Sequence, residues 1–95
     1  RNQYLSAEER HAAPVLFRAL TQAQQLYADG ERDAERIKTV MQHVIAAEPL
    51  SKLEYIAIND AHTLAPLIDL QDQAAVISLA VRFGNTRLID NLLLP

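Results

Sequence analysis

The sequence contains no cysteine and no tryptophan, and only two of its 95 residues are glycine. The absence of cysteine excludes disulfide bonds and thiolate chemistry, and it indicates a reducing compartment. Gly30 and Gly84 stand alone, so neither belongs to a phosphate-cradling loop of the P-loop or dinucleotide-binding kind. Aromatic residues make up 5% of the chain, too few to form a stacking surface for nucleic-acid bases.

The chain also lacks an excess of positive charge, because nine lysines and arginines face twelve acidic residues and the net charge is −3. This balance disfavours a nucleic-acid binder, which needs a clustered basic face. No apolar run approaches the roughly 20 residues of a membrane span, and no signal peptide is visible. We therefore expect a cytoplasmic protein without nucleic-acid or membrane partners. Because the chain starts at Arg1 without an initiator methionine, we expect it to come from a longer protein.

What the sequence does contain is the composition of one small folded domain. Hydrophobic residues make up 49% and charged residues 22% of the 95 positions, as in globular proteins. A chain of this size buries only roughly 60–65% of the surface that its unfolded form exposes, so its core is thin. No repeat, low-complexity segment or internal linker divides the chain.

The amino-terminal segment predicts a short helix. Ser6 and Glu9 have the spacing of a capping box, in which each side chain bonds the backbone amide of the other. A helix is expected over Ala7–His11, followed by a kink or break, because Pro14 disfavours helical geometry at the residue before it.

Two longer helices follow, each with apolar residues spaced by three and four. The first is expected to start near Pro14, since proline suits the first helical position, and to end at Gly30 as the C′ residue. The second is expected to run from an N-cap at about Asp33 to Ala47. The short turn at residues 29–32 that joins the two helices predicts an antiparallel helical hairpin.

The second half of the chain is richer in β-branched residues and predicts strands. Leu53–Ile58 is expected to be the first, and His62–Leu67 a loop or a single helical turn. Ala75–Phe83 and Arg87–Leu93 flank the turn signal Gly84-Asn85 and are expected to form a β-hairpin. The predicted fold class is α+β, with a helical hairpin packed on a small three-stranded, mainly antiparallel sheet.

The residue types alone predict no catalytic residue and no metal site. His11, His43 and His62 do not have the spacing of metal ligands, and no cysteine is present to assist them. Asp69 and Asp72 flank a loop, which is weak evidence for acid–base catalysis.

Arginines at the two ends of the chain are the remaining candidates. Arg87 and Asp90 lie on the last predicted strand, where we expect them to pair with each other or with the helices and to serve the structure. Arg1 carries a guanidinium group suited to bidentate binding of phosphate. Taken alone, however, a terminal arginine is most often a plain surface residue.

Two sequence stretches resemble a known family. Residues 1–10, Arg-Asn-Gln-Tyr-Leu-Ser-Ala-Glu-Glu-Arg, resemble the Met-Ser-Ser-Arg-Asn-x-Tyr-Leu-(Ser/Thr)-x-Glu-(Glu/Gln)-Arg signature of pantoate–β-alanine ligases, or pantothenate synthetases. Residues 84–91, Gly-Asn-Thr-Arg-Leu-Ile-Asp-Asn, resemble the Gly-x-(Thr/Ala)-Arg-Leu-Ile-Asp-Asn hairpin of the same family. Residues 13–16, 28–33 and 60–64 are also similar in order and spacing, so the resemblance covers the whole chain.

The resemblance implies an enzyme with a Rossmann-like amino-terminal domain, which holds the substrates, and a carboxy-terminal domain that lies over them as a lid. Such an enzyme adenylates pantoate with ATP and magnesium, releases pyrophosphate, and then joins the pantoyl group to β-alanine with release of AMP. Residues 1–95 are expected to be the carboxy-terminal lid domain alone. Its expected partners are the missing amino-terminal domain and these substrates, and the parent enzyme is expected to be a homodimer.

The resemblance also implies a role for Arg1, which matches the family's arginine facing the ATP phosphates. The two serines that precede this arginine in the family are absent here, and so is the amino-terminal site. We therefore expect the chain alone to be inactive and to bind ATP weakly. The alternative interpretation is a free-standing α+β module that binds another protein and has no catalytic activity.

Overall fold

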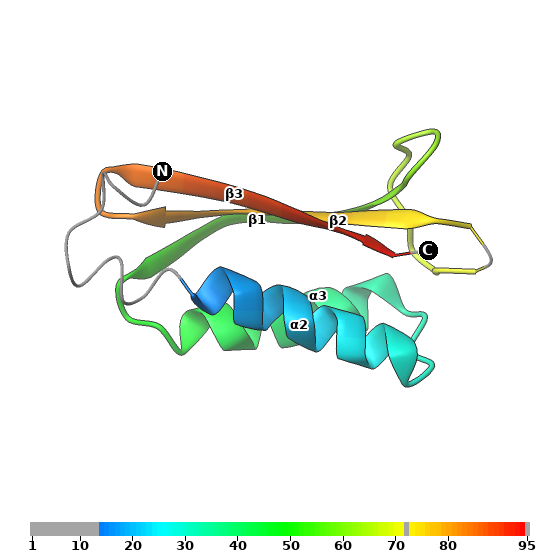
Figure 1. The fold of residues 1–95 in the computed structure, drawn as a ribbon, viewed down its shortest axis with the longest axis horizontal. Coiled ribbons are helices and arrows are strands. Elements are labelled where there is room, and N and C mark those ends of the chain that lie inside the picture. Colours follow the sequence, from blue (N-terminus) through cyan, green and yellow to red (C-terminus); the bar gives the residue numbers. More distant parts are fainter. Residues whose placement is uncertain (1–13, 72, 95) are drawn as a thin grey trace.

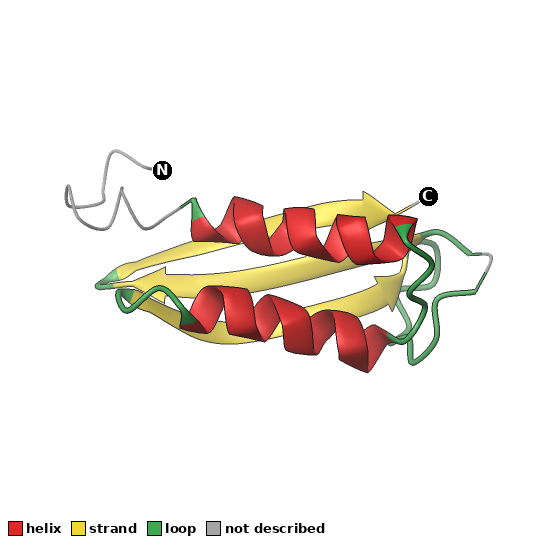
Figure 2. Ribbon diagram, turned by 90° about the horizontal axis from the view of Figure 1, so that it is seen from below, coloured by secondary structure: helices red, strands yellow, loops and turns green. Residues whose placement is uncertain are grey.

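The structure is a computed structural model that describes residues 14–71 and 73–94. Two helices, α2 (Val15–Ala28) and α3 (Ala34–Ala46), precede three strands, β1 (Ser51–Asp60), β2 (Ala75–Phe83) and β3 (Thr86–Leu94). The helices lie side by side on one face of the sheet, as Figures 1 and 2 show. The predicted α+β class is confirmed, whereas the predicted helix over residues 7–11 lies outside the described residues.

The turn between the helices closes as a Schellman motif. The Gly30 N–H donates to the Tyr27 carbonyl at 3.1 Å, and the Glu31 N–H donates to the Leu26 carbonyl at 2.9 Å. Gly30 has a φ of 104°, which glycine adopts without steric cost, so its predicted role as the C′ residue is confirmed. The Arg32 guanidinium donates to the Tyr27 carbonyl at 2.8 Å and lies 3.9 Å from the centre of the Tyr27 ring.

The second helix starts at its predicted N-cap. Asp33 has an extended backbone, and its carboxylate accepts a hydrogen bond from the Glu35 N–H at 3.0 Å. This bond satisfies one of the amide groups that the first turn of a helix leaves free. No helix in the described part of the chain is long and apolar enough to cross a membrane.

The sheet is antiparallel throughout its described strands, with the order β1-β2-β3. β1 extends beyond the predicted Leu53–Ile58, because its polar ends still pair with β2 from Ser51 to Asp60. The β2–β3 hairpin turns at Gly84, whose φ of 60° suits the first central position of a type II′ turn.

The connection between β1 and β2 is a turn followed by an irregular loop, so of the two alternatives predicted for His62–Leu67 the loop is confirmed and the helical turn is not. The loop is attached to the start of α3, since the Leu70 N–H donates to the Arg32 carbonyl at 2.7 Å. In the same region the Ala34 N–H donates to the Ile68 carbonyl at 2.9 Å.

The core lies between the two helices and the sheet. Alternate residues of β2 point to the helices, as expected for a strand with one covered face. These residues and the buried faces of the helices pack into a single hydrophobic core. Its buried members include Val15, Leu16, Ala19, Leu20, Ala23, Ala34, Ile37, Met41, Ile45, Ile58, Ile77, Leu79, Val81, Phe83, Leu88 and Leu94. The sheet face that turns away from α2 and α3, called the open face below, carries no described helix or strand (Figure 1).

Candidate functional site on the open face of the sheet

Among the residues that the structure describes, those singled out by the sequence do not come together in a catalytic group. Arg1, His11 and Asp72 lie outside the described residues, so the role of Arg1 in ATP binding stays a prediction. His43 is exposed in the last turn of α3, and His62 is exposed in the turn after β1. No group of three or more His, Cys, Asp or Glu side chains within residues 14–71 and 73–94 is arranged to hold a metal ion.

The expected pairing of Arg87 with Asp90 or with the helices is wrong. Arg87 instead donates from its Nε to Glu54 of β1. Residues three apart on a strand point to opposite faces, so Arg87 and Asp90 cannot meet. The Asp90 carboxylate accepts a hydrogen bond from the Asn91 N–H at 2.8 Å.

A β-bulge places Glu54 beside two arginines. The register of β1 against β2 shifts between Leu53 and Tyr55, so Glu54 has no partner in β2. A bulge of this kind re-aims a side chain, and here it directs the carboxylate over the open face. One carboxylate oxygen accepts from Arg82 Nε at 3.0 Å, and the other accepts from Arg87 Nε.

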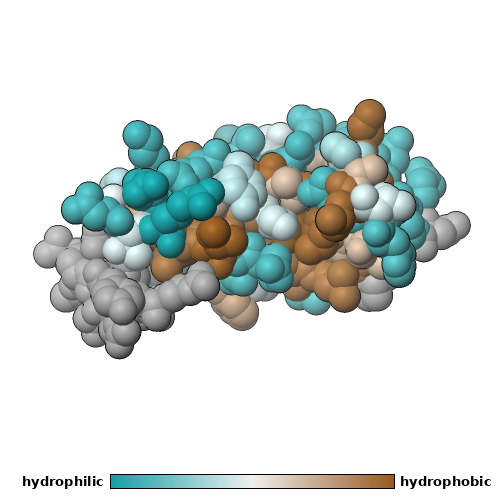
Figure 3. All heavy atoms as spheres, turned by 90° about the horizontal axis from the view of Figure 1, so that it is seen from above, coloured by the Kyte–Doolittle hydropathy of each residue, from teal (hydrophilic) through white to brown (hydrophobic). Residues whose placement is uncertain are grey.

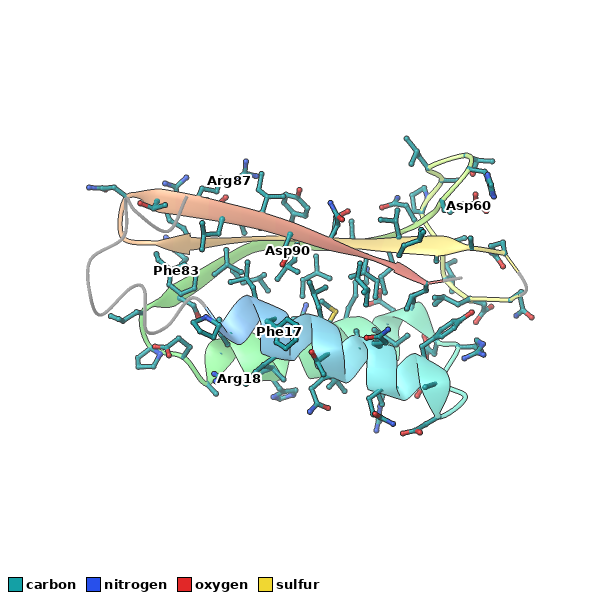
Figure 4. All side chains as sticks on the ribbon, viewed as in Figure 1. Phe17, Arg18, Asp60, Phe83, Arg87 and Asp90 are labelled. Carbon is teal, nitrogen blue, oxygen red and sulfur yellow. The ribbon has the colours of Figure 1, made fainter. Side chains whose placement is uncertain are left out.

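Three cations lie side by side on the open face near the hairpin end of the sheet. Lys52 of β1 is the register partner of Arg82 in β2, and Arg82 is the register partner of Arg87 in β3. Directly opposite residues share one face of a sheet, so these three side chains form a line across all three strands, called the cationic row below. Figure 4 shows Arg87 projecting from this face, and Figure 3 shows hydrophilic side chains gathered over the hairpin end.

Like charges directly opposite each other destabilise a sheet, and Glu54 offsets this effect. The two guanidinium groups lower the pKa of Glu54 below its ordinary value of 4.5, the hydrogen bond from Arg87 having the largest effect and that from Arg82 the next. The Arg87 guanidinium also lies 5.8 Å from the centre of the Tyr55 ring, a favourable cation–π distance. Glu54 therefore restrains the positions of both guanidinium groups, and the Tyr55 ring restrains that of Arg87 as well.

The lowered pKa of Glu54 predicts a pH dependence of stability. A carboxylate with a depressed pKa stabilises the folded state above its unfolded pKa, and this contribution is lost as pH falls through the folded pKa. The difference in free energy of unfolding between wild type and Glu54→Gln should thus be constant above roughly pH 5.5 and shrink on acidification below the ordinary value. Urea unfolding of both proteins across this range measures it. A difference that is the same at about pH 3 and pH 7 would contradict the assigned ion pairs.

Two other acidic residues have structural roles. The Asp60 carboxylate caps the turn after β1, accepting from the N–H groups of His62 at 2.7 Å and Thr63 at 2.9 Å. These bonds lower the pKa of Asp60, with Thr63 contributing most. Asp69, a weak candidate for acid–base catalysis, is exposed, and its backbone forms a bridge with that of Asp33.

A second surface feature is a shallow groove of about 380 Å³ at the helical layer. Phe17, which is 72% exposed, lies on its wall with Val44 and Arg18. Among the described residues the lining is mainly apolar, and Arg18 is its only charged member. These side chains offer no acid–base pair.

Glu54, Arg82 and Lys52 were not predicted from the sequence. Lys52 and Glu54 lie two apart in the first strand, and Arg82 and Arg87 flank the predicted two-residue turn at positions that a tight hairpin pairs. That Arg82 and Arg87 lie opposite each other could therefore have been predicted from the register of the hairpin. The contribution of Glu54 depends on the bulge, which the sequence does not signal.

Comparison with known proteins connects this fold to one family. The sequence profile described as Pantoate-beta-alanine ligase matches residues 1–93. The chain is 52% identical over 94 residues to the pantothenate synthetase of Herpetosiphon aurantiacus and 47% identical over 91 residues to that of Agrobacterium fabrum. These matches cover 99% and 96% of this chain, but only 34% and 31% of the two relatives.

A solved structure agrees with the sequence matches. The crystal structure of pantothenate synthetase from Thermus thermophilus superposes with a TM-score of 0.85 at 40% identity, over 96% of this chain and 32% of that one. The chain thus spans about a third of the length of the relatives that it matches. The profile matches residues 1–93, and a relative is 52% identical over 94 residues. The chain therefore belongs to the pantoate-beta-alanine ligase family, as part of its carboxy-terminal region.

Proposed function

We propose that this chain is the carboxy-terminal lid domain, residues 1–95, of an ATP-dependent ligase that joins pantoate to β-alanine. The observation that carries the proposal is the match to the family over residues 1–93 in a chain that spans only a third of its relatives. The described residues contain no metal-binding group, and their acidic side chains have structural partners or are exposed. The reacting groups are accordingly assigned to the amino-terminal two thirds of the parent enzyme.

The proposed reaction has two steps. A pantoate carboxylate oxygen attacks the α-phosphorus of ATP, which forms pantoyl adenylate and releases pyrophosphate. The β-alanine amine then attacks the pantoyl carbonyl, which forms the amide bond of pantothenate, while AMP leaves and the amine loses a proton. We assign magnesium to the ATP phosphates and to the amino-terminal domain. We also propose that the parent enzyme is cytoplasmic and homodimeric.

Within this scheme Arg1 contacts the phosphates of the nucleotide. A guanidinium group beside the departing pyrophosphate offsets the charge that accumulates there, an interaction that is strongest in the transition state. The lid is expected to close as one body, because α2, α3 and the sheet share a single core. Closure would bring Arg1 to the phosphates and exclude water from the adenylate.

A chimeric enzyme tests the proposal. In the Herpetosiphon aurantiacus relative, the third that this chain matches is replaced by residues 1–95, and pantothenate formation from ATP, pantoate and β-alanine is measured. We expect activity within roughly tenfold of that of the unmodified relative, since the two sequences are 52% identical over 94 residues. The truncated relative, lacking that third, is the control and should be inactive. A folded chimera without activity would refute the proposed lid function.

A further inference from the structure

The cationic row is unusual for this molecule because the chain as a whole is acidic. Its net charge is −3, yet Lys52, Arg82 and Arg87 are adjacent in register across the three strands. Among the described side chains, Glu54 is the only carboxylate paired with any of the three. The row therefore retains an excess of positive charge on an exposed surface.

The hydrogen bonds leave the arginines suited to a further acceptor. Glu54 accepts from the Nε atom of each arginine, so both guanidinium groups are held from one edge. The Nη atoms of Arg82 and Arg87 donate to no acceptor in the part of the chain that the structure describes. The side chains are 40% and 43% exposed, so these donors are accessible. The same holds for Lys52, an exposed residue with no ion pair among residues 14–71 and 73–94.

We propose that the cationic row is a binding site for a phosphoryl anion with two linked phosphates. Two guanidinium groups held side by side present paired N–H donors that match phosphate oxygens, and the lysine adds a third charge at the edge of the row. A diphosphate has enough oxygens to reach all three cations, whereas a single phosphate does not bridge three strands spaced about 4.8 Å apart. In the parent enzyme the anion is the polyphosphate of the nucleotide or the released pyrophosphate, and this assignment of the source rests on the proposed function.

Titration of the 95-residue chain with inorganic pyrophosphate tests the site, using calorimetry or the NMR shifts of β2 and β3 at low salt. Saturable binding is expected, and Arg87→Gln should weaken it about tenfold, the value of one charge-assisted hydrogen-bonded contact. Lys52→Gln, which breaks no bond within the described fold, should weaken it roughly threefold. Inorganic monophosphate should bind at least about fivefold more weakly than pyrophosphate.

Arg18→Gln is the matched control, because it removes one positive charge from the helical layer, on the opposite side of the molecule from Arg87 (Figure 4). Its affinity for pyrophosphate should equal that of wild type. Absence of saturable binding, or equal weakening by Arg18→Gln and Lys52→Gln, would overturn the proposal and leave the row as a surface for an acidic protein segment. Circular dichroism verifies that each variant is folded.

The source of the anion is resolved in the chimeric enzyme. If Arg87→Gln raises the KM for ATP, the nucleotide polyphosphate occupies the row; if it only weakens inhibition by pyrophosphate, the released product does. An unchanged KM and unchanged inhibition would overturn the role of the row in the enzyme. Pyrophosphate binding by the isolated chain is independent of the chimera, so failure of the proposed function and failure of this site give different results.

Discussion

Phe83→Ala is expected to lower the free energy of unfolding by about 3–5 kcal/mol, which approaches the total stability of a small domain. Phe83 is completely buried at the end of β2, the central strand, where its ring fills the space between the sheet and the helices. Removing the ring leaves a cavity in a core that is already thin for its surface. Urea unfolding followed by circular dichroism measures the loss.

Phe17→Ala is the matched control for this substitution. The same side chain is removed, but Phe17 is 72% exposed at the groove of the helical layer. The expected change is within about 0.5 kcal/mol, as for most surface positions. Similar losses for the two variants would show that the core is not where the structure places it.

Arg1→Ala in the chimeric enzyme is expected to slow formation of pantoyl adenylate by about 10²–10³-fold, the usual effect of removing one preorganised donor to developing charge. The free energy of unfolding should stay unchanged, because the predicted contact is with the nucleotide. Single-turnover release of pyrophosphate measures the first step without the second. Arg18→Ala, which removes an arginine from the helical layer, is the control and should retain the full rate.

A different result would alter the mechanism. A full adenylation rate for Arg1→Ala would remove this residue from catalysis. Slow adenylation together with a loss of folding stability would assign it a structural role instead. Only the first step should respond, since pyrophosphate has left before β-alanine attacks.

Most of the fold was predictable because its determinants are local. The Asp33 N-cap, the Gly30 C′ residue and the Gly84 turn each depend on neighbouring residues, and the structure has all three. The ends of β1 were not predicted, because Ser51 and Asp60 are polar and belong to the strand only through pairing with β2.

The cluster on the open face was less predictable for a physical reason. Glu54 meets Arg82 and Arg87 across separations of 28 and 33 residues, and only the sheet register brings them together. The bulge that directs Glu54 to this face has no marker such as glycine in the sequence. Arg87 was predicted to pair with Asp90 or with the helices, but strand geometry forbids contact with Asp90, and its partner Glu54 lies on β1.

The central claim is that this chain completes an active site whose reacting groups lie in another domain. Its most direct test is pantoate-dependent exchange of labelled pyrophosphate into ATP, measured for three samples: the 95-residue chain, the truncated relative and the chimera that joins them. We predict exchange by the chimera alone. Exchange by the isolated chain, or equal exchange by the truncated relative and the chimera, would contradict it.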